Sequence, residues 1–466
     1  MFIPISKCVG IFGAQYGDEA KGKLVYEYVD TFSKDESIEK VVCVRFNGGS
    51  NAGHSIYING TLYDTHILPS GILSEKCINV IGTGVIINPI QIFDELFKLN
   101  TKLELNSIKL GKLFISDRCH MTLLIHKFID FIEGKKHGST GSGISQTIGD
   151  KANRRGIQYY QLLSGDWENS IRELYQYYFN HYSSAANSER TDLDYFHQFE
   201  YKINCCGQQK IFSSKEEMME FEIDFIKEKL SELKEMITNT IILMNSFDVN
   251  VPIIFEGANS VMLDPNIGYP NCTATSCTIG GLLSGSDVNI NFLTKRNFKT
   301  IGVCKGYITR VGTGHLITED TGENGETLQK VGMEFGTTTG RKRRTGWFDC
   351  PLMRYTKQIN WFDYLNITKL DVLSQFSSVK ICVGYKNIIT GVIHRERDFN
   401  DNDSSNYEQV EVIMDGWQGF DLSSVKCWED LHPNIQKYIE FIEAELDTKI
   451  CYINTGKEHR MLISRF

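Results

Sequence analysis

The residues best suited to chemistry lie in a glycine-rich segment near the start of the chain. Val9 to Phe12 is a predicted strand, Gly17 to Lys23 reads G-x-x-x-x-G-K, and the residues that follow favour a helix. In such a loop successive backbone N–H groups form an anion site, and the helix N-terminus adds partial positive charge. Lys21 or Lys23 can then contact phosphate oxygens. A bare match is often a solvated glycine turn, but the order strand, loop, helix favours phosphate binding.

This loop departs from the usual phosphate-loop pattern in two ways. Leu24 follows the last lysine, where a Ser or Thr hydroxyl normally binds magnesium, and two acids, Asp18 and Glu19, lie inside the loop. A carboxylate beside phosphates would repel them unless it binds Mg²⁺ or acts as a base at the reacting centre. The loop therefore indicates chemistry on a second substrate as well as nucleotide binding.

Other polar loops follow predicted strands. His54, in a loop after Val41 to Phe46, is a candidate acid, although a histidine alone is more often structural. Gly336 to Gly346 reads GTTTGRKRRTG, and arginine side chains there can bind a small dicarboxylate or phosphate in a bidentate manner. Ser139 to Gly156 has similar chemistry, with Thr140 as a phosphate contact. Each of these segments taken alone could also be a solvated surface turn.

A short pattern near residue 370 is typical of guanine recognition. Thr368 to Asp371 reads T-K-L-D, and the carboxylate can accept two hydrogen bonds from guanine that adenine cannot donate. Asn454 to Gly456, after another apolar run, can close over the base. The pattern is weak alone but gains weight beside a phosphate loop.

Short Val- and Ile-rich runs between helical stretches predict an α/β fold with a large, mostly parallel sheet flanked by helices and a nucleotide site like that of P-loop NTPases. Such runs include Pro252 to Phe255, Thr300 to Cys304 and Ile381 to Val383. Helices are expected over Ser214 to Asn245 and Pro433 to Glu445. The whole chain, 1–466, is predicted to be one catalytic domain with polar surface insertions near 183–213 and 395–407.

Composition excludes several classes of protein. The chain carries a net charge of -9 with no basic stripe, so we expect no nucleic-acid partner. Its 13 cysteines include no CxxC pair, which argues against a zinc site and favours reduced thiols in the cytoplasm. No leader-like pattern and no apolar run of transmembrane length is present, so we expect neither secretion nor a membrane.

Several segments, in this order, resemble the adenylosuccinate synthetase family over nearly the whole chain: GAQYGDEAKGK, GGSNAGHS, HILPSGIL, GVIINP, DKANRRG, FEGANSVMLD, YITRVGTG, GTTTGRKRRTGWFD and TKLDVL. The resemblance implies a cytoplasmic, homodimeric, Mg²⁺-dependent ligase of purine biosynthesis. Its substrates are GTP, inosine monophosphate (IMP) and L-aspartate. GTP phosphorylates the 6-oxygen of IMP, and the aspartate amino group then displaces that phosphate. The products are adenylosuccinate, GDP and phosphate, in the first committed step from IMP to AMP.

The resemblance also implies a role for individual residues. The catalytic set is Asp18 as base, His54 as acid, Lys21 over the phosphates and Asn259 at the 6-oxyanion. Magnesium would be held by Asp18 and the carbonyl of Gly53. The implied GTP contacts are Gly17, Asp18, Glu19, Ala20, Lys21, Gly22, Lys23, Gly53, His54, Ser55, Arg343, Lys369, Asp371, Asn454, Thr455 and Gly456. The implied IMP contacts are Asp18, Lys21, Asn51, His54, Thr140, Arg154, Asn259, Thr273 and Arg341, with Arg154 lent by the partner subunit. The implied aspartate contacts are Thr337, Thr338, Thr339, Gly340, Arg341 and Arg343.

Three positions depart from the family pattern. Ala20 stands where Gly is usual, and we expect little effect from its methyl group. Asn259 stands where the family has glutamine and is shorter by one methylene, and Ser142 replaces a common arginine. These changes concern affinity rather than the reaction.

Two classes of alternative function remain. A regulatory GTP-binding switch protein shares the phosphate loop and T-K-L-D but leaves the basic loop without a role. A non-catalytic nucleotide-binding protein would bind GTP without turnover, which the presence of Asp18, Lys21 and His54 disfavours. A third possibility, a ligase for a different acid, fits the nearly complete resemblance least.

Overall fold

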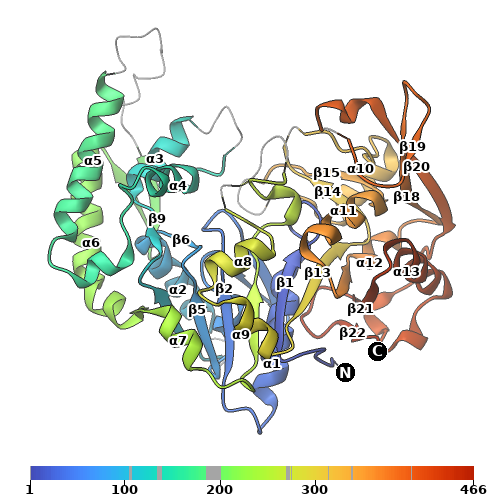
Figure 1. Ribbon diagram of the computed structural model, residues 1–466, viewed down its shortest axis with the longest axis horizontal. Helices are drawn as coiled ribbons and strands as arrows, with labels where there is room; N and C mark the ends of the chain where they lie inside the picture. The colour runs from blue at the N-terminus through green and yellow to red at the C-terminus, as the bar shows by residue number, and fades with distance from the viewer. Residues whose placement is uncertain are drawn as a thin grey trace.

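The computed structural model describes residues 2–103, 108–133, 139–184, 201–268, 273, 275–312, 314–336, 340–399 and 401–466. Its centre is a ten-stranded sheet in the order β11-β7-β5-β2-β12-β1-β13-β17-β21-β22 (Figure 1). Neighbouring strands are parallel except for the last pair, β21 and β22, which is antiparallel. The expected parallel α/β sheet is therefore confirmed. In chain order its strands are β1 Cys8–Gly13, β2 Val41–Arg45, β5 Cys77–Ile81, β7 Lys112–Ser116, β11 Ile237–Thr238, β12 Ile253–Glu256, β13 Lys299–Lys305, β17 Tyr364–Thr368, β21 Lys449–Asn454 and β22 Leu462–Ser464.

Helices and small sheets surround this centre. The helices are α1 Lys21–Lys34, α2 Pro89–Leu103, α3 Leu124–Glu133, α4 Ile144–Ala152, α5 Trp167–Ser184, α6 Lys215–Met236, α7 Thr240–Ser246, α8 Ile279–Gly285, α9 Ile290–Lys295, α10 Glu323–Val331, α11 Cys350–Asn360, α12 Leu370–Leu373 and α13 Pro433–Leu446. The remaining strands are β3 His54–Ile58, β4 Thr61–Thr65, β6 Ile86–Ile87, β8 His120–Met121, β9 Tyr201–Cys205, β10 Gln208–Phe212, β14 Ile308–Arg310, β15 Arg344–Gly346, β16 Phe348–Asp349, β18 Ser378–Asn387, β19 Ile393–His394 and β20 Tyr407–Asp415.

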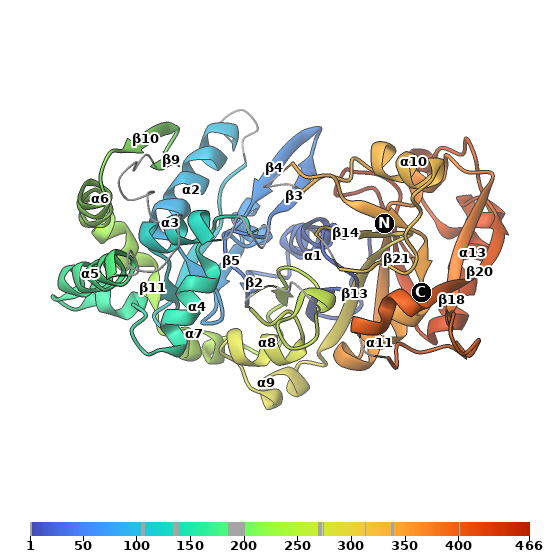
Figure 2. The same cartoon turned by 90° about the horizontal axis from the view of Figure 1, so that it is seen from above.

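Three large apolar cores among the described residues hold these layers together. On one face of the sheet, α1 buries Leu24, Val25 and Val29 against Val9 and Ile11 of β1. On the other face, one large core joins the sheet to α8, α9, α11 and α13. A third core lies beyond β5 and β7, where it joins α2, α3, α5 and α6. Figures 1 and 2 place this helical region and the β18–β20 sheet at opposite ends of the molecule.

The structure corrects two expectations about elements. The helix predicted over Ser214 to Asn245 is broken, because Ile237 and Thr238 form β11 beside β7 and the Asn239 side chain caps a new helix, α7. The run Ile381 to Val383 lies in a separate sheet, where β18 pairs antiparallel with β20. Its burial on both sides made it indistinguishable from the parallel strands in the sequence. The helix predicted from Pro433 is confirmed as α13.

The two predicted insertions contain regular structure. Within the first, β9 and β10 form a hairpin, and Tyr201 and Phe212 are buried in the third core. Within the second, residues 401–406 form a short 3₁₀ helix, and the Phe399 ring stacks on Tyr407 at 3.9 Å between centroids. The single-domain boundary stays a prediction.

The two ends of the chain meet on the same side of the sheet. The Ile3 backbone N–H donates to Ser464 Oγ at 2.9 Å, and both views show the termini close together (Figures 1 and 2). Among the described residues, every helix is too short or too polar to cross a bilayer. The cysteines in these residues are all free thiols.

Candidate active site

Six neighbouring strands deliver the predicted site residues to one edge of the sheet. These strands are β2, β12, β1, β13, β17 and β21, and they run parallel. Their carboxyl ends lead into the loops that begin at Phe46, Gly257, Ala14, Gly306, Lys369 and Thr455. In open α/β sheets ligands bind at this edge. The fold therefore brings segments far apart in the sequence into one candidate active site.

The phosphate loop turns sharply between β1 and α1. Gly17, Asp18 and Ala20 have φ values of 99°, 59° and 70°, so three of four consecutive residues adopt left-handed backbone conformations. The helix begins at Lys21, directly after Ala20. A left-handed conformation costs an L-residue about 1–2 kcal/mol, so the methyl group of Ala20 adds strain that a glycine there would avoid. The expectation that this departure has little effect is therefore wrong for the backbone.

The two acids of the loop are separated by the fold. Glu19 is fully buried and accepts hydrogen bonds from the backbone N–H groups of Gln15 and Gly17 at 3.3 and 2.8 Å. It also accepts from the Ser260 hydroxyl, and its contact with Lys21 Nζ is 2.8 Å. Burial would raise the Glu19 pKa, but the Lys21 charge and these hydrogen bonds lower it. The Glu19 carboxylate thus stabilises the fold of the loop from inside, whereas the Asp18 side chain is partly exposed to solvent.

Lys23, in the first turn of α1, links the phosphate loop to the loop between β21 and β22 near the C-terminus. Its Nζ donates to the carbonyl oxygens of Gly456 and Met461, each at 2.7 Å. Burial lowers the pKa of Lys23 to about 7, although Glu27 and Asp371 oppose this shift. In this structure both lysines of the loop therefore have protein partners, Lys21 on Glu19 and Lys23 on the 454–461 loop.

Asp18 is the outermost member of a line of alternating charges. It pairs with Arg343 Nη2, and Arg343 Nη1 donates to Glu334 at 2.7 Å. Glu334 in turn accepts from Lys305 Nζ at 2.8 and 2.9 Å. Burial would raise the Glu334 pKa, but Lys305, Lys369 and Arg343 together lower it to about 2. Glu334 is consequently ionised at any pH at which the protein is expected to work.

His54 is oriented by a buried carboxylate. Its Nδ1 contacts Glu256 at the end of β12, and Glu256 also accepts from the Ser70 N–H at 2.7 Å and from the Ser70 hydroxyl. Burial would raise the pKa of Glu256, but His54 and Arg45 lower it to about 2. Burial lowers the pKa of His54 against the opposing charge of Glu256. His54 therefore directs its other ring nitrogen, Nε2, away from Glu256, and Nε2 has no hydrogen bond with a described residue.

Two of the predicted IMP contacts present buried oxygens that lack a partner. Among the described residues, Asn51 Oδ1 and Asn259 Oδ1 accept no hydrogen bond. Asn259 has a φ of 61°, and its amide lies close to Gly48, in the loop that follows β2. Buried polar atoms are rarely left unpaired in a folded protein, so both amides are suited to a ligand. The Thr273 hydroxyl, in contrast, donates to the Leu263 carbonyl at 3.0 Å.

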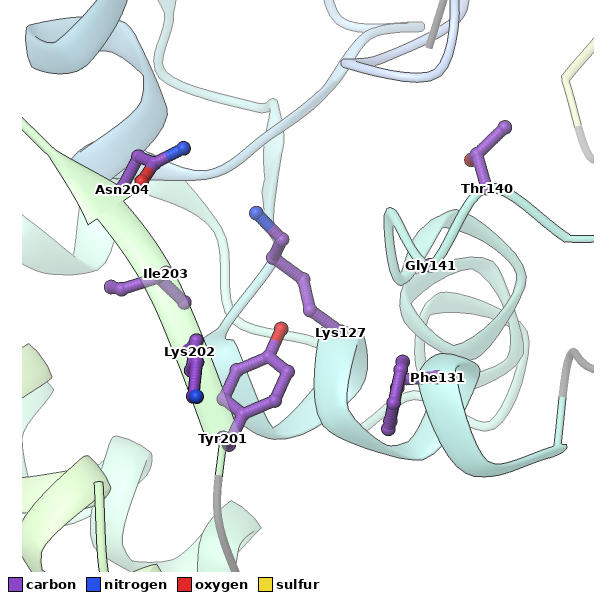
Figure 3. A pocket seen from close by; sticks show the side chains of 8 residues that line it. All are labelled: Lys127, Phe131, Thr140, Gly141, Tyr201, Lys202, Ile203 and Asn204. Carbon is purple, nitrogen blue, oxygen red and sulfur yellow. The ribbon is translucent and has the colours of Figure 1, made fainter. Parts of the chain in front are cut away.

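Thr140 and Arg154 flank α4 and are both exposed. Thr140 pairs with the Ser142 hydroxyl at 2.8 Å and borders a cavity of about 470 Å³ that Lys127 enters from α3 (Figure 3). Arg154 has a φ of 61°, and its guanidinium forms no hydrogen bond or ion pair with another described residue. The adjacent Arg155 forms an ion pair with Asp150, with 2.8 Å between Nε and Oδ1.

The predicted guanine-binding residues lie where β17 passes into α12. Lys369 has a φ of 63° and donates from Nζ to the Gly332 carbonyl at 2.9 Å, whereas Asp371 is exposed. Across the edge, Asn454 Oδ1 and Thr455 Oγ1 are buried without a hydrogen-bond partner among the described residues. The two segments thus offer a carboxylate and unpaired polar atoms near each other in the strand order.

The predicted aspartate loop is described in part. Thr337, Thr338 and Thr339 lie outside the described residues. Gly340 has a φ of 64°, and Gly340 and Arg341 are exposed while Arg343 is buried. Of the remaining predicted residues, Gly53 lies beside the His66 ring, and the Ser55 hydroxyl donates to Asp64.

The sequence reasoning missed Glu256, Ser70 and Glu334. Glu256 directly follows the predicted apolar run Pro252 to Phe255, and polar residues after such runs are the signal that identified the other loops, so the sequence could have indicated it. Glu334 lies two residues before the start of the basic loop at Gly336 and carries no pattern of its own. Its position became evident from its contacts alone.

Comparison with known proteins assigns the family. The model of the family described as adenylosuccinate synthetase matches residues 10–463. Adenylosuccinate synthetases of Uncinocarpus reesii and Talaromyces marneffei are each 37% identical to the chain, covering 98% of it and 99% of their own length. The fully ligated adenylosuccinate synthetase structure of Plasmodium falciparum aligns with a TM-score of 0.82 and 32% identity, covering 99% of this chain and 100% of that one. The chain belongs to the adenylosuccinate synthetase family.

Proposed function

We propose that the edge formed by these six strands carries out the family reaction with Asp18 and His54 as its acid–base residues. The chain is a ligase of purine biosynthesis that joins L-aspartate to IMP at the expense of GTP. The observation that best supports the two roles is the way each side chain is held. Asp18 is paired with a buried arginine at the open side of the phosphate loop, and His54 is fixed by Glu256.

In the first step Asp18 removes the N1 proton of IMP, so that negative charge develops on the 6-oxygen. That oxygen attacks the γ-phosphorus of GTP, and the bond to the β-phosphate oxygen breaks to release GDP. Asn259 lies in the loop after β12, and its amide can donate to the oxyanion. In the second step the aspartate amino group attacks C6 and expels phosphate, leaving adenylosuccinate.

His54 is suited to act on the transferred phosphate. The depressed pKa leaves the free ring neutral near pH 7, with Nδ1–H donated to Glu256 and Nε2 an acceptor. A phosphate dianion beside Nε2 favours the protonated ring. The ring then donates from Nε2 to the leaving oxygen, while Glu256 stabilises its positive charge.

Magnesium fits the donors of this site. Asp18 presents a partly exposed carboxylate, and Mg²⁺ is usually held by one or two carboxylates together with substrate phosphates. Asp18 and the carbonyl oxygen of Gly53 would hold the ion. When bound, the ion would neutralise charge on the phosphate oxygens. The residues predicted to bind GTP, IMP and aspartate are retained as proposals, with Asp371 selecting guanine through two accepted hydrogen bonds.

The protein is further proposed to work as a cytoplasmic homodimer. Arg154 supports this proposal, because an exposed arginine in a left-handed turn is placed to reach a neighbouring subunit. Reduced, mostly buried thiols are consistent with the cytoplasm.

Reconstitution tests the function. Purified protein is mixed with Mg²⁺, GTP, IMP and aspartate, and the ultraviolet change of the purine is followed, with each component omitted in turn and ATP replacing GTP. A signal that needs all four components and is lost with ATP is expected. GTP hydrolysis without IMP or aspartate would instead indicate a regulatory switch, and GTP binding without any turnover would indicate a non-catalytic binding protein.

A further inference from the structure

Glu334 is the centre of a buried polar cluster beside the candidate active site. Its carboxylate is 1% exposed and accepts hydrogen bonds from Lys305 Nζ at 2.8 and 2.9 Å, from the Tyr307 hydroxyl at 2.6 Å and from Arg343 Nη1 at 2.7 Å. These donors come from the end of β13, from the loop that follows it and from the residue directly before β15. A rotation of the carboxylate would leave the buried Lys305 or Arg343 cation unpaired, and an unpaired buried charge is strongly unfavourable.

Arg343 is anchored to Glu334 at two points. Besides the side-chain contact, the Arg343 backbone N–H donates to the Glu334 carbonyl oxygen at 2.9 Å. Glu334 itself is fixed, because its N–H donates to the Gln329 carbonyl at 2.9 Å and Gln329 Nε2 donates to its carbonyl at 3.2 Å. The direction of the guanidinium therefore follows from the position of one acidic residue.

The other half of the guanidinium lies beside Asp18 of the phosphate loop. Arg343 Nη2 forms an ion pair with Asp18, yet Nη2 and Nε lie outside hydrogen-bond geometry with every described residue. Exposure increases along the line of charges, from 1% for Lys305 and Glu334 to 7% for Arg343 and 36% for Asp18. Two buried donors with unfilled hydrogen-bonding capacity thus lie behind Asp18, at the phosphate loop where anionic substrates are expected.

We propose that Glu334 is a positioning residue for catalysis. It holds Arg343 by Nη1, so that Nη2 meets Asp18 in the free enzyme, and Nη2 and Nε meet the carboxylate of aspartate in the complex. When aspartate binds, Arg343 exchanges the Asp18 carboxylate for that of the substrate and keeps its hydrogen bond to Glu334. A guanidinium fixed in this way loses less rotational freedom when the substrate binds. This proposal rests on the proposed role of Arg343 in aspartate binding.

The test compares Glu334→Gln with Tyr307→Phe in the full-length enzyme. Glu334→Gln keeps the shape of the side chain and removes the charge that fixes Arg343. Tyr307→Phe removes one hydrogen bond from the same carboxylate and leaves Arg343 in place. We expect Glu334→Gln to raise the KM for aspartate at least tenfold and to lower kcat. The dissociation constant for IMP, measured by calorimetry, should change less than threefold. Tyr307→Phe should leave all three values within threefold of the wild type.

Two further observations separate positioning from folding and from the assigned function. If Glu334→Gln fails to fold, Glu334→Asp retains the charge but withdraws it from Arg343, and the KM for aspartate should still rise. A wild-type enzyme without aspartate-dependent turnover would refute the proposed function itself. Wild-type turnover together with an unchanged aspartate KM in the folded Glu334 variant would refute the positioning role alone. Equal rises in aspartate KM and IMP dissociation constant would likewise refute it, since that result indicates general disorder of the site.

Discussion

Replacing Glu256 by Gln should affect stability and catalysis together. In the folded protein the Glu256 carboxylate is fully buried, and its pKa is lowered from 4.5 to about 2. Because one pKa unit corresponds to about 1.4 kcal/mol, this shift sets an upper limit of roughly 3 kcal/mol on the stability that ionised Glu256 contributes, since the share due to His54 is complete only when that ring is protonated. Glutamine retains the size of the side chain and can still accept from Ser70. We therefore expect the free energy of unfolding to fall by up to about 3 kcal/mol.

The pH dependence of this loss provides an internal check. The folded protein holds the Glu256 proton more weakly than the unfolded chain does. The stability that Glu256 contributes is consequently complete above pH 4.5 and is lost as the pH falls toward 2. Urea unfolding of the wild type and Glu256→Gln should give curves that differ at pH 7 and converge as the pH is lowered below 4.5. A difference that stays constant over this range would show that Glu256 is not the ionised partner of His54.

Catalysis should fall because His54 loses the carboxylate that fixes its tautomer. General acid catalysis contributes on the order of 10²–10⁴-fold, so a drop in kcat of roughly 100-fold or more is expected. Ser70→Ala is the matched control: it removes one hydrogen bond from the charged Glu256, should cost about 1.5–3 kcal/mol of stability, and should leave kcat nearly unchanged because the carboxylate still fixes His54. If Glu256→Gln is less stable but retains the wild-type kcat, Glu256 does not act through His54.

Three further predictions concern the loops at the same edge. Asp18→Asn should abolish turnover with the fold retained, because Asn tolerates the left-handed φ of this position, and near-normal turnover would exclude Asp18 as the base. Asp371→Asn should raise the KM for GTP by about 100-fold or more, because the amide cannot accept both guanine hydrogen bonds. An unchanged KM in that variant would remove Asp371 from the guanine site. Ala20→Gly should raise the free energy of unfolding by about 0.5–1 kcal/mol. This value is the left-handed strain of about 1–2 kcal/mol, reduced by the conformational entropy that glycine adds to the unfolded chain. A lower midpoint of thermal unfolding in this variant would contradict the prediction.

Much of the fold could be predicted because the sequence signals were local. The strands β1, β2, β5, β12 and β13 are mostly apolar and are buried along nearly their whole length, as parallel strands covered on both faces require. Polar, glycine-rich loops at their carboxyl ends then placed most candidate residues on one edge. The same reasoning failed for Ile381 to Val383, because a buried strand of a mixed sheet has the same local pattern.

The groups that orient the candidate catalytic residues could not be predicted in the same way. His54 and Glu256 are 202 residues apart in the chain, and Lys305 and Glu334 are 29 apart. A buried carboxylate is stable only when other parts of the chain supply its hydrogen-bond and ion-pair partners. A single sequence does not indicate which distant residues will form those contacts. The role of Glu19 was hidden for the same reason, since its partner Ser260 comes from the loop after β12.

Two departures from the family pattern, Ala20 and Asn259, are the sequence neighbours of Glu19 and Ser260. They have opposite effects on backbone strain. Ala20, at φ 70°, replaces a residue that tolerates this conformation freely, whereas Asn259, at φ 61°, is itself a residue that favours it. Asparagine at 259 therefore relieves strain that glutamine would have incurred, at the cost of one methylene of reach toward the 6-oxygen. Glu19 of the phosphate loop accepts a hydrogen bond from Ser260, so the position of the 257–260 loop is tied to that of the phosphate loop. The reach of the Asn259 amide toward the proposed oxyanion therefore depends on the position of the phosphate loop, through the Glu19–Ser260 contact.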